Sequence, residues 1–242
     1  MKTRIFYTTN AGLYFCSDSA EILVDGIHDA GAVGFHPFHE EMRKQMRSEK
    51  GLFVDSGVLL FTHLHKDHYD EVAVREYIRK HPETGLWGPG LDTRGIRDIR
   101  TEGDTVHFNC GDMSITAYRT KHSGPRTLNV PHYSLLLQNE AAGESFLIAG
   151  DAVLEPELAE RINQAVKSST NGVCAFVMAY QLAERKSKAF MAALSPSRIF
   201  LIHQPGPEDD AYGKVSRIKS FAIRETSSGA LVEEPEQMSW IK

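Results

Sequence analysis

Three histidines and one aspartate crowd into a short part of the segment FTHLHKDHYD, at 61–70. His63 and His65 are two residues apart, and Asp67 and His68 follow directly after Lys66. In an extended segment, residues two apart point to the same face, so the first two histidines can converge on one metal ion. A turn after them can direct the next aspartate and histidine to a second ion. Neutral imidazoles and carboxylates are ligands that Zn²⁺ and similar metals prefer. The motif predicts a metal site, and the alternative is a polar, solvated loop.

Three further candidate ligands stand close to the ends of apolar runs elsewhere in the chain. His122 comes after ITAYRT, Asp151 comes after FLIAG, and His203 comes after RIFLI. A sheet fixes the residues at the ends of its strands more firmly than a free loop does, which suits metal ligands. Taken singly, each residue could instead be a hydrogen-bonded surface residue. Together with the motif, they predict enough ligands for two metal ions.

The segments on either side of the motif have different patterns. The run VLLFT, at 58–62, is continuously apolar, which is typical of a strand covered on both faces. The segment at 70–81 carries apolar residues at helical spacing and begins with Asp70, a candidate N-cap. A strand is therefore predicted to lead into the motif and a helix to lead away from it.

Similar patterns extend over the whole chain. Strands are predicted at 4–9, 12–17, 21–26, 58–62, 105–109, 113–120, 132–138, 145–151, 173–178 and 198–203. Helices are predicted at 36–50, 70–81, 155–167, 181–194 and 212–222. The first of these helices, at 36–50, is charged and is expected to be a surface helix or a lid. Strand-rich segments with scattered helices predict two packed sheets with helices on the outside.

The composition limits the classes of protein that the chain can belong to. Its 242 residues, of which 41% are hydrophobic, predict one domain over residues 1–242 with a sizeable core. A net charge of −5 offers no general basic field for nucleic acid or anionic lipid. The first 21 residues resemble neither a secretory signal nor a membrane span, and Cys16, Cys110 and Cys174 are widely spaced. We therefore expect a cytoplasmic protein with reduced thiols and without nucleic-acid or membrane partners.

The order of the candidate residues resembles that of the metallo-β-lactamase superfamily over nearly the whole chain. The matching residues are Asp25 in ILVDG, His63, His65, Asp67, His68, His122, Asp151 and His203. The resemblance implies an α/β fold, namely the four-layer αββα sandwich of two mixed β-sheets flanked by helices, with the site at one edge of the sheets. The segments LIAGDA and FLIHQPG look most like the small metal-dependent hydrolases related to ascorbate-phosphate lactonase.

The resemblance also implies a role for each matched residue. The implied ligands are His63, His65 and His122 for one metal ion, Asp67, His68 and His203 for the other, and Asp151 as the bridge between them. Asp25 is expected to support the metal loop through hydrogen bonds without binding metal. The expected cofactors are two divalent metal ions, with zinc favoured and manganese or iron as alternatives, because these metals accept nearly the same ligands.

Such a binuclear metal site is suited to hydrolysis. Two metal ions about 3.5–4 Å apart can share a water molecule and lower its pKa toward about 7, which makes a bridging hydroxide available. The expected reaction is cleavage of a small ester, lactone, amide or phosphoester. Asp67 is the candidate catalytic residue, because it could orient the hydroxide and return a proton to the leaving group. The sequence contains no G-x-S-x-G motif that would indicate a serine nucleophile instead.

The sequence gives fewer indications of the substrate. The candidate substrate-binding residues are His28, Lys121, His132 and Tyr180. Two of them, His132 and His28, lie beside predicted strand ends, from which a side chain could face the metals. Arg119 and Arg126 flank Lys121, and a positive rim of this kind would suit an anionic group on a small-molecule substrate. The alternative is a solvated basic loop, and the oligomeric state is left open.

Three other classes of protein remain as alternatives. A mononuclear iron sulfur dioxygenase can carry similar histidines. A nucleic-acid phosphodiesterase of this superfamily usually needs an added RNA-binding arm or a second domain, for which an acidic chain of 242 residues has little room. A ligand-binding or structural protein on an inactive scaffold is disfavoured by the complete ligand set.

Overall fold

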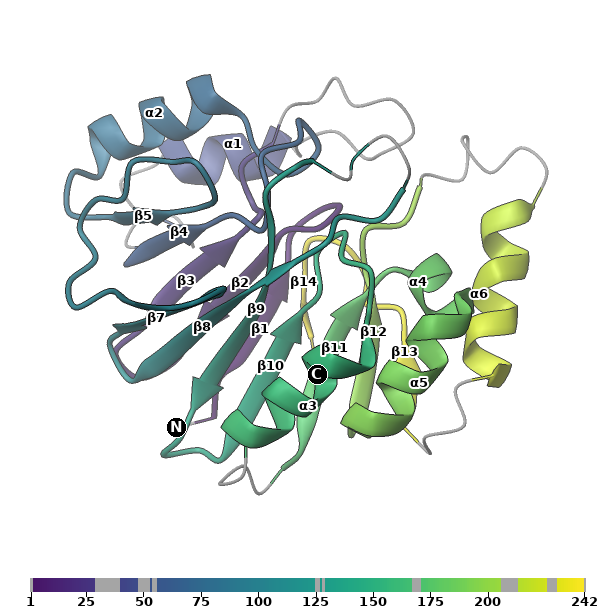
Figure 1. The fold of residues 1–242 in the computed structure, drawn as a ribbon. Helices are drawn as coiled ribbons and strands as arrows, with labels where there is room; N and C mark the ends of the chain where they lie inside the picture. Colours follow the sequence, from purple (N-terminus) through teal and green to yellow (C-terminus); the bar gives the residue numbers. More distant parts are fainter. Residues whose placement is uncertain are drawn as a thin grey trace.

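Two β-sheets, built from strands that lie far apart in the sequence, form the centre of the structure (Figure 1). The computed structural model describes residues 2–28, 40–47, 53, 56–124, 127, 129–166, 171–205, 213–225 and 230–241. The strands of the first sheet are β1 (Arg4–Tyr7), β2 (Leu13–Cys16), β3 (Glu21–Val24), β4 (Val58–Leu60), β5 (Gly85–Trp87) and β14 (Ser239–Ile241). Their order is β14-β1-β2-β3-β4-β5. The pairs from β3 to β5 are parallel and the others are antiparallel.

The second sheet is the larger of the two. Its strands are β6 (Arg100–Glu102), β7 (Thr105–Cys110), β8 (Met113–Thr120), β9 (His132–Asn139), β10 (Glu144–Ile148), β11 (Val173–Val177), β12 (Arg198–Leu201) and β13 (Leu231–Glu233). They lie side by side in reverse order of number, from β13 to β6. The pairs from β6 to β10 are antiparallel, whereas those from β10 to β13 are parallel. Both sheets are therefore mixed.

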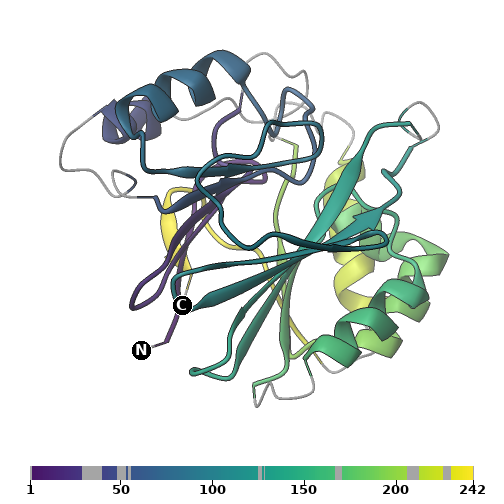
Figure 2. The same cartoon turned by 60° about the vertical axis from the view of Figure 1, so that its left-hand side comes forward.

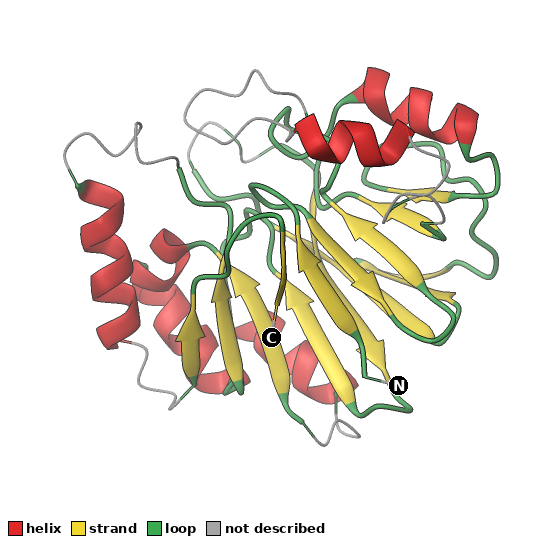
Figure 3. Cartoon of the chain, turned by 180° about the vertical axis from the view of Figure 1, so that it is seen from behind, coloured by secondary structure: helices red, strands yellow, loops and turns green. Residues whose placement is uncertain are grey.

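Helices cover the outer face of each sheet, so that the sheets form the two inner layers (Figures 2 and 3). The helices are α1 (Glu40–Arg47), α2 (Glu71–Lys80), α3 (Pro156–Ala165), α4 (Ala179–Ala183), α5 (Arg185–Leu194) and α6 (Lys214–Glu225). The first two lie over the first sheet, and the other four lie over the second. In the part of the chain that the structure describes, no helix is long and apolar enough to cross a membrane.

Three apolar cores fill the spaces between these four layers, and the alternation of side chains along each strand assigns residues to them. In β3, Ile22 points into the core between the sheets, whereas the next residue, Leu23, packs under α1 and α2. In β10, Ile148 faces the first sheet and Leu147 faces α3 and α5. Successive side chains of a strand point to opposite faces, so strands covered on both faces must be apolar throughout. This explains the continuous apolar run that leads into the histidine motif.

Most of the predicted elements are present with slightly shorter bounds. The helix predicted at 70–81 is α2, and the Asp70 side chain caps it by accepting a hydrogen bond from the Ala73 N–H at 3.0 Å. The helix predicted at 36–50 is α1 over residues 40–47, whereas 36–39 and 48–50 lie outside the described residues. Met42 of α1 is fully buried in the outer core of the first sheet, so this helix packs on the sheet.

Two predictions about the elements were wrong. The single helix predicted at 181–194 is divided into α4 and α5, because Glu184 adopts an extended conformation with ψ 141°. The side chain of Gln181 holds α4 through bonds to backbone groups outside the helix, and the chain turns after it. The strands β5, β6, β13 and β14 were not predicted. Each has three residues, which is too short for a period of two to be recognised.

Candidate metal centre

All the predicted metal ligands lie beyond strand ends at one edge of the sandwich. The motif at 63–68 follows β4 of the first sheet, whereas His122, Asp151 and His203 follow β8, β10 and β12 of the second. An isolated antiparallel bridge between His122 and Ala152 places the first two of these loops side by side. Loops from both sheets therefore bring the candidate ligands together at one place.

The first of two clusters contains three imidazole nitrogens and one carboxylate oxygen. His65 Nδ1 lies 3.1 Å from His63 Nε2 and 3.1 Å from His122 Nε2, and these last two atoms are 3.3 Å apart. Asp151 Oδ2 lies 3.5 Å from His122 Nε2 and 3.9 Å from His63 Nε2. This grouping is one of those that could hold a metal ion.

The second cluster uses the other oxygen of the same aspartate. Asp151 Oδ1 lies 3.3 Å from His68 Nε2 and 3.3 Å from His203 Nε2, and the two nitrogens are 3.0 Å apart. Asp67 Oδ2 lies 3.5 Å from His203 Nε2. Asp151 therefore has one carboxylate oxygen in each cluster, which is the arrangement expected of a bridging ligand.

Hydrogen bonds fix which ring nitrogens can bind a cation. His122 Nδ1 donates to the Ser123 carbonyl at 2.7 Å, and His68 Nδ1 donates to Asp25 Oδ2 at 3.0 Å. Thr62 Oγ1 donates its only hydrogen to Asp25 Oδ2 at 2.7 Å, so at its 3.1 Å contact with His63 Nδ1 the imidazole is the donor. In a neutral imidazole the other nitrogen, Nε2, then carries a lone pair directed into the cluster.

The clusters fit metal ions on both geometry and chemistry. A tetrahedral metal ion at about 2.0–2.1 Å from each ligand holds its ligands about 3.3–3.4 Å apart. Burial lowers the pKa of His63 well below its ordinary value, so this imidazole is neutral and its Nε2 carries a lone pair. That nitrogen lies 3.3 Å from His122 Nε2, which also carries a lone pair. Two lone pairs at this distance repel unless a cation lies between them. Asp151 Oδ1, moreover, is buried without a hydrogen-bond partner among the described residues.

The second cluster is rich in buried negative charge. Burial alone would lower the pKa of His68, but the carboxylates of Asp151 and Asp25 raise it well above its ordinary value. Burial would likewise raise the pKa of Asp151, and His203 and His68 instead hold it well below its usual range. The carboxylates thus favour a positive charge in the second cluster. A proton on His68 Nε2 and a metal ion bound to the same nitrogen exclude one another.

Asp25, for which the resemblance implied a supporting role, bonds to the start of the motif and to one of its histidines. Its carboxylate accepts hydrogen bonds from the Thr62 N–H at 2.8 Å, from the Thr62 hydroxyl and from His68. The residue is fully buried and has a φ of 46°, in the left-handed region. It therefore holds the start of the motif and one histidine ring without reaching either cluster directly.

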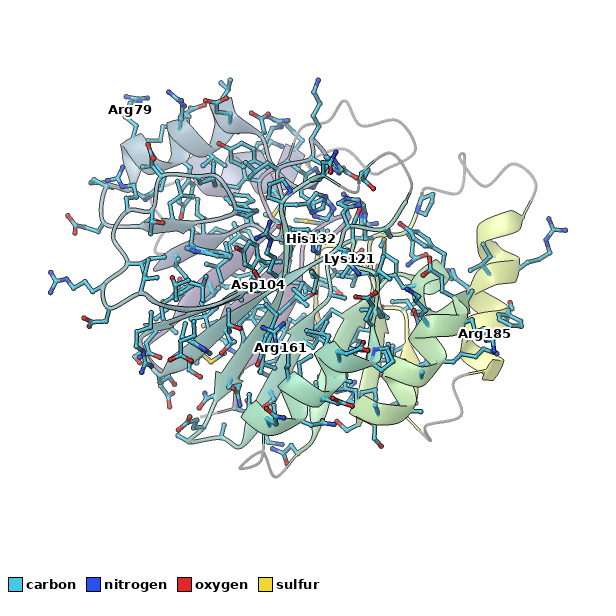
Figure 4. All side chains as sticks on the ribbon, viewed as in Figure 1. Arg79, Asp104, Lys121, His132, Arg161 and Arg185 are labelled. Atoms are coloured by element: carbon cyan, nitrogen blue, oxygen red, sulfur yellow. The ribbon has the colours of Figure 1, made fainter. Side chains whose placement is uncertain are left out.

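The structure corrects the prediction that His132 lines the substrate pocket. His132 is fully buried, in the interior of the sandwich (Figure 4), and burial lowers its pKa to about 3. Its Nε2 accepts a hydrogen bond from the Asp151 N–H at 3.0 Å, and its Nδ1 donates to the Thr120 hydroxyl at 2.7 Å. Both nitrogens are thus engaged by the protein, and the ring holds the backbone of the bridging aspartate.

The other substrate-binding candidates lie in different surroundings. His28 is also buried, with Nε2 3.2 Å from the Thr9 hydroxyl, so it lies beneath the surface. Lys121 is exposed and pairs with Glu155 at 3.2 Å. Tyr180 is half-buried, and burial followed by the charges of Asp151 and Asp67 raises the pKa of its phenol. Arg126 lies outside the described residues.

The supporting roles of two residues were not predicted from the sequence. Gln181 donates from Nε2 to the carbonyls of Gly150 at 3.0 Å and Ala152 at 2.8 Å, on either side of the bridging aspartate. Asn10, in the turn between β1 and β2, bonds to His203 and to the backbone of Asp67. Turn asparagines and helix glutamines are common, so neither residue type carried a recognisable signal.

Solved structures with a similar fold are known, although their sequences differ widely from this one. No protein-family model and no curated protein matches the chain. The solved structure of CmlA, a diiron β-hydroxylase from Streptomyces venezuelae, is 14% identical with a TM-score of 0.63. It covers 100% of this chain, which spans 54% of CmlA. Igni18, a novel metallo hydrolase from Ignicoccus hospitalis, is 15% identical over 99% of this chain and 97% of its own, with a TM-score of 0.57.

A possible metal-dependent hydrolase from Veillonella parvula is 14% identical over 100% of this chain and 99% of its own, with a TM-score of 0.58. At these identities the likeness concerns the fold. The fold is the αββα sandwich of two mixed sheets that the resemblance to the metallo-β-lactamase superfamily implied. Within this fold, the chain carries a buried cluster of histidines and aspartates that could hold metal. The branch related to ascorbate-phosphate lactonase stays a prediction.

Proposed function

We propose that this chain is a metal-dependent hydrolase with a binuclear centre, most readily of zinc, that cleaves a small ester, lactone, amide or phosphoester. The observation that carries the proposal is the position of Asp151. Its Oδ2 lies 3.5 Å from His122 Nε2 in one cluster, and its Oδ1 lies 3.3 Å from His203 Nε2 in the other. One carboxylate shared between two sets of candidate ligands could hold two metal ions close together, as in a two-metal site.

The residues around such a centre would have different roles in hydrolysis. Bound divalent metal ions supply Lewis acidity and lower the pKa of water, which makes a nucleophile available at neutral pH. His68 is fully buried, whereas His65 is half-buried, so a substrate would approach from the side of His65. Asp67 retains some exposure, 12% of its side chain, and we propose that it both binds metal and transfers a proton to the leaving group.

Tyr180 is the residue proposed to contact the substrate. Burial, followed by the charges of Asp151 and Asp67, raises the pKa of its phenol, which therefore stays protonated and can only donate a hydrogen when it meets an anionic oxygen. We expect Tyr180→Phe to lower kcat/KM by about 10–100-fold, because one hydrogen bond to a charged group contributes about 1.5–3 kcal/mol. Metal content, measured in parallel, should not change.

The matched control for this variant is Tyr118→Phe. Tyr118 is buried in the core on the outer face of the second sheet, where it packs against Arg161. Its loss of a hydroxyl should leave kcat/KM within about twofold. Equal turnover in wild type and Tyr180→Phe would remove Tyr180 from the substrate site.

The structure weakens the case for an anionic substrate. Lys121 pairs with Glu155, whose carboxylate also lies 3.3 Å from Lys186, and Arg119 pairs with Asp104 at 3.5 Å. These rim cations are therefore partly compensated by acids, and the proposal includes neutral substrates. We propose a small-molecule substrate without a nucleic-acid partner. Cys16, Cys110 and Cys174 are free thiols, which supports the further proposal that the protein acts in a reducing cytoplasm.

An iron-dependent oxidative reaction is a second candidate. It is favoured by one observation, the likeness in fold to a diiron β-hydroxylase at a TM-score of 0.63. The mononuclear iron sulfur dioxygenase suggested by the sequence belongs to the same class. Histidine and carboxylate ligands accept iron as well as zinc or manganese, so the ligand set does not separate these reactions.

Elemental analysis of protein purified without chelators or added metal separates the two candidates. We expect about two zinc or manganese ions per chain, together with hydrolysis of a panel of lactones, esters and phosphodiesters that a chelator abolishes and added metal restores. Iron as the resident metal, with oxygen consumption and no hydrolysis, would contradict the proposal and favour oxidation. The same protein freed of metal serves as the control for contaminating hydrolases.

A further inference from the structure

Asn10 is a fully buried polar residue in the turn between β1 and β2, and the proposed reaction has not yet given it a role. Its backbone has a φ of 56°, in the left-handed region where glycine is the residue without strain. The turn itself is closed by backbone bonds, from Thr8 N–H to the Gly12 carbonyl at 3.0 Å and from Gly12 N–H to the Thr9 carbonyl at 2.9 Å. The hairpin therefore does not need the asparagine side chain.

The polar groups of Asn10 are directed instead to two metal-ligand loops. The amide Nδ2 donates to the Asp67 carbonyl at 2.6 Å, which fixes the amide orientation and directs Oδ1 to His203. Oδ1 accepts from His203 Nδ1 at 2.5 Å, and the Asn10 carbonyl accepts from the His203 N–H at 2.8 Å and the Tyr7 hydroxyl at 2.7 Å. One side chain thus joins the loop after β4 to the loop after β12.

These contacts determine the state of the second cluster. Because Asn10 Oδ1 can only accept, His203 must carry its hydrogen on Nδ1 and present the Nε2 lone pair to the cluster. The contact with the Asp67 backbone sets the position of a second ligand of that cluster. The bonds that support the histidines of the first cluster come from other groups, namely Thr62 for His63 and Ser123 for His122.

We propose that Asn10 is a positioning residue for the second metal ion and has little effect on the first. This inference rests on the proposed two-metal function and adds to it a residue that decides how many metals are held. Removing a partner that orients a metal-binding histidine weakens metal affinity by about 10–100-fold. The effect should therefore fall on one of two binding steps, whereas a residue that only stabilised the fold would affect both.

The test uses Asn10→Gly, because glycine accepts the positive φ and the variant removes only the side chain. Zinc binding to metal-free full-length protein is measured by competition with a chromogenic chelator, and circular dichroism checks the fold. We expect the second zinc to bind about 10–100-fold more weakly than in wild type and the first to change by less than about threefold. Asn139→Ala, at a buried asparagine at the end of β9, is the matched control and should bind both zinc ions as wild type does.

Asn10→Asp tests the contact with His203 by itself. It keeps an acceptor for His203 Nδ1 but places an oxygen against the Asp67 carbonyl, so it should hold the second zinc better than Asn10→Gly. Equal loss in the two variants would overturn the assignment to His203, and two wild-type binding steps in Asn10→Gly would overturn the inference as a whole. Failure of the wild type to bind a second zinc would instead contradict the proposed binuclear centre, so the two failures are distinguishable.

Discussion

Asp151→Asn is expected to reduce the metal content from about two ions per chain to one or fewer. The amide has nearly the same shape, but it carries no charge and has only one oxygen. In the wild type, one carboxylate oxygen lies 3.3 Å from His68 and His203, in the second cluster, and the other lies 3.5 Å from His122, in the first. The amide therefore cannot place an oxygen in both clusters. Removing one hydrogen-bond donor from an oxyanion hole lowers kcat by about 10²–10³-fold, and loss of a metal ion that stabilises the same charge should lower it at least as much.

Elemental analysis and steady-state hydrolysis of the same preparation check this prediction. Asp104→Asn is a suitable control, because Asp104 is exposed and only pairs with Arg119. That variant should keep both metals and full turnover. An Asp151→Asn protein that retained two metals per chain and normal hydrolysis would show that Asp151 does not bridge them.

Gly150→Ala is expected to be among the most destabilising single substitutions near the site. Gly150 has a φ of 57°, and a Cβ added there would lie 2.7 Å from His132 Nε2 and 2.9 Å from Thr62 Cβ. The left-handed conformation costs a non-glycine residue about 1–2 kcal/mol, and overpacking adds about 1–3 kcal/mol. We expect unfolding free energy to fall by about 2–5 kcal/mol in total. Displacing His132 would also release the Asp151 N–H and weaken metal binding.

Urea denaturation of metal-free wild type and variant measures this loss. Gly103→Ala is a close control, because Gly103 has nearly the same φ of 58° and an added Cβ there would meet nothing within 4 Å. The unfolding free energy of the control should fall by only about 1–2 kcal/mol, because of the left-handed conformation. If both variants lost the same stability, the close approach of His132 and Thr62 would not matter.

The residues that gather at the candidate metal centre could be predicted from the sequence because their chemistry is carried by residue type. A single histidine or aspartate after an apolar strand has ordinary structural uses, but the segment 58–68 joins such a strand to four of them. The layers were predictable for a related reason. Strands such as β4 and β10 are covered on both faces, and that burial leaves a continuous apolar run in the sequence.

The roles of His132, Asn10 and Gln181 could not be predicted in the same way. Whether His132 faces the metals or the backbone of Asp151 depends on how β9 packs against its neighbours, and the sequence of one strand does not specify that. Asn10 is far in the sequence from both of its partners, Asp67 and His203, so a pattern of neighbouring residues cannot predict these contacts. The break at Glu184 is likewise a tertiary effect, because Gln181 holds α4 against the loop around Asp151.

The division of the ligands between the sheets has a consequence for how the molecule unfolds. The residues at 63–68 follow a strand of the first sheet, whereas His122, Asp151 and His203 follow strands of the second, so the proposed metal ions would cross-link layers that are otherwise joined mainly by apolar packing. Separating the sheets then requires release of the metal. Binding at a free concentration 1,000 times the dissociation constant would add about 4 kcal/mol to the unfolding free energy. Metal supply would thus set how much of the protein is folded.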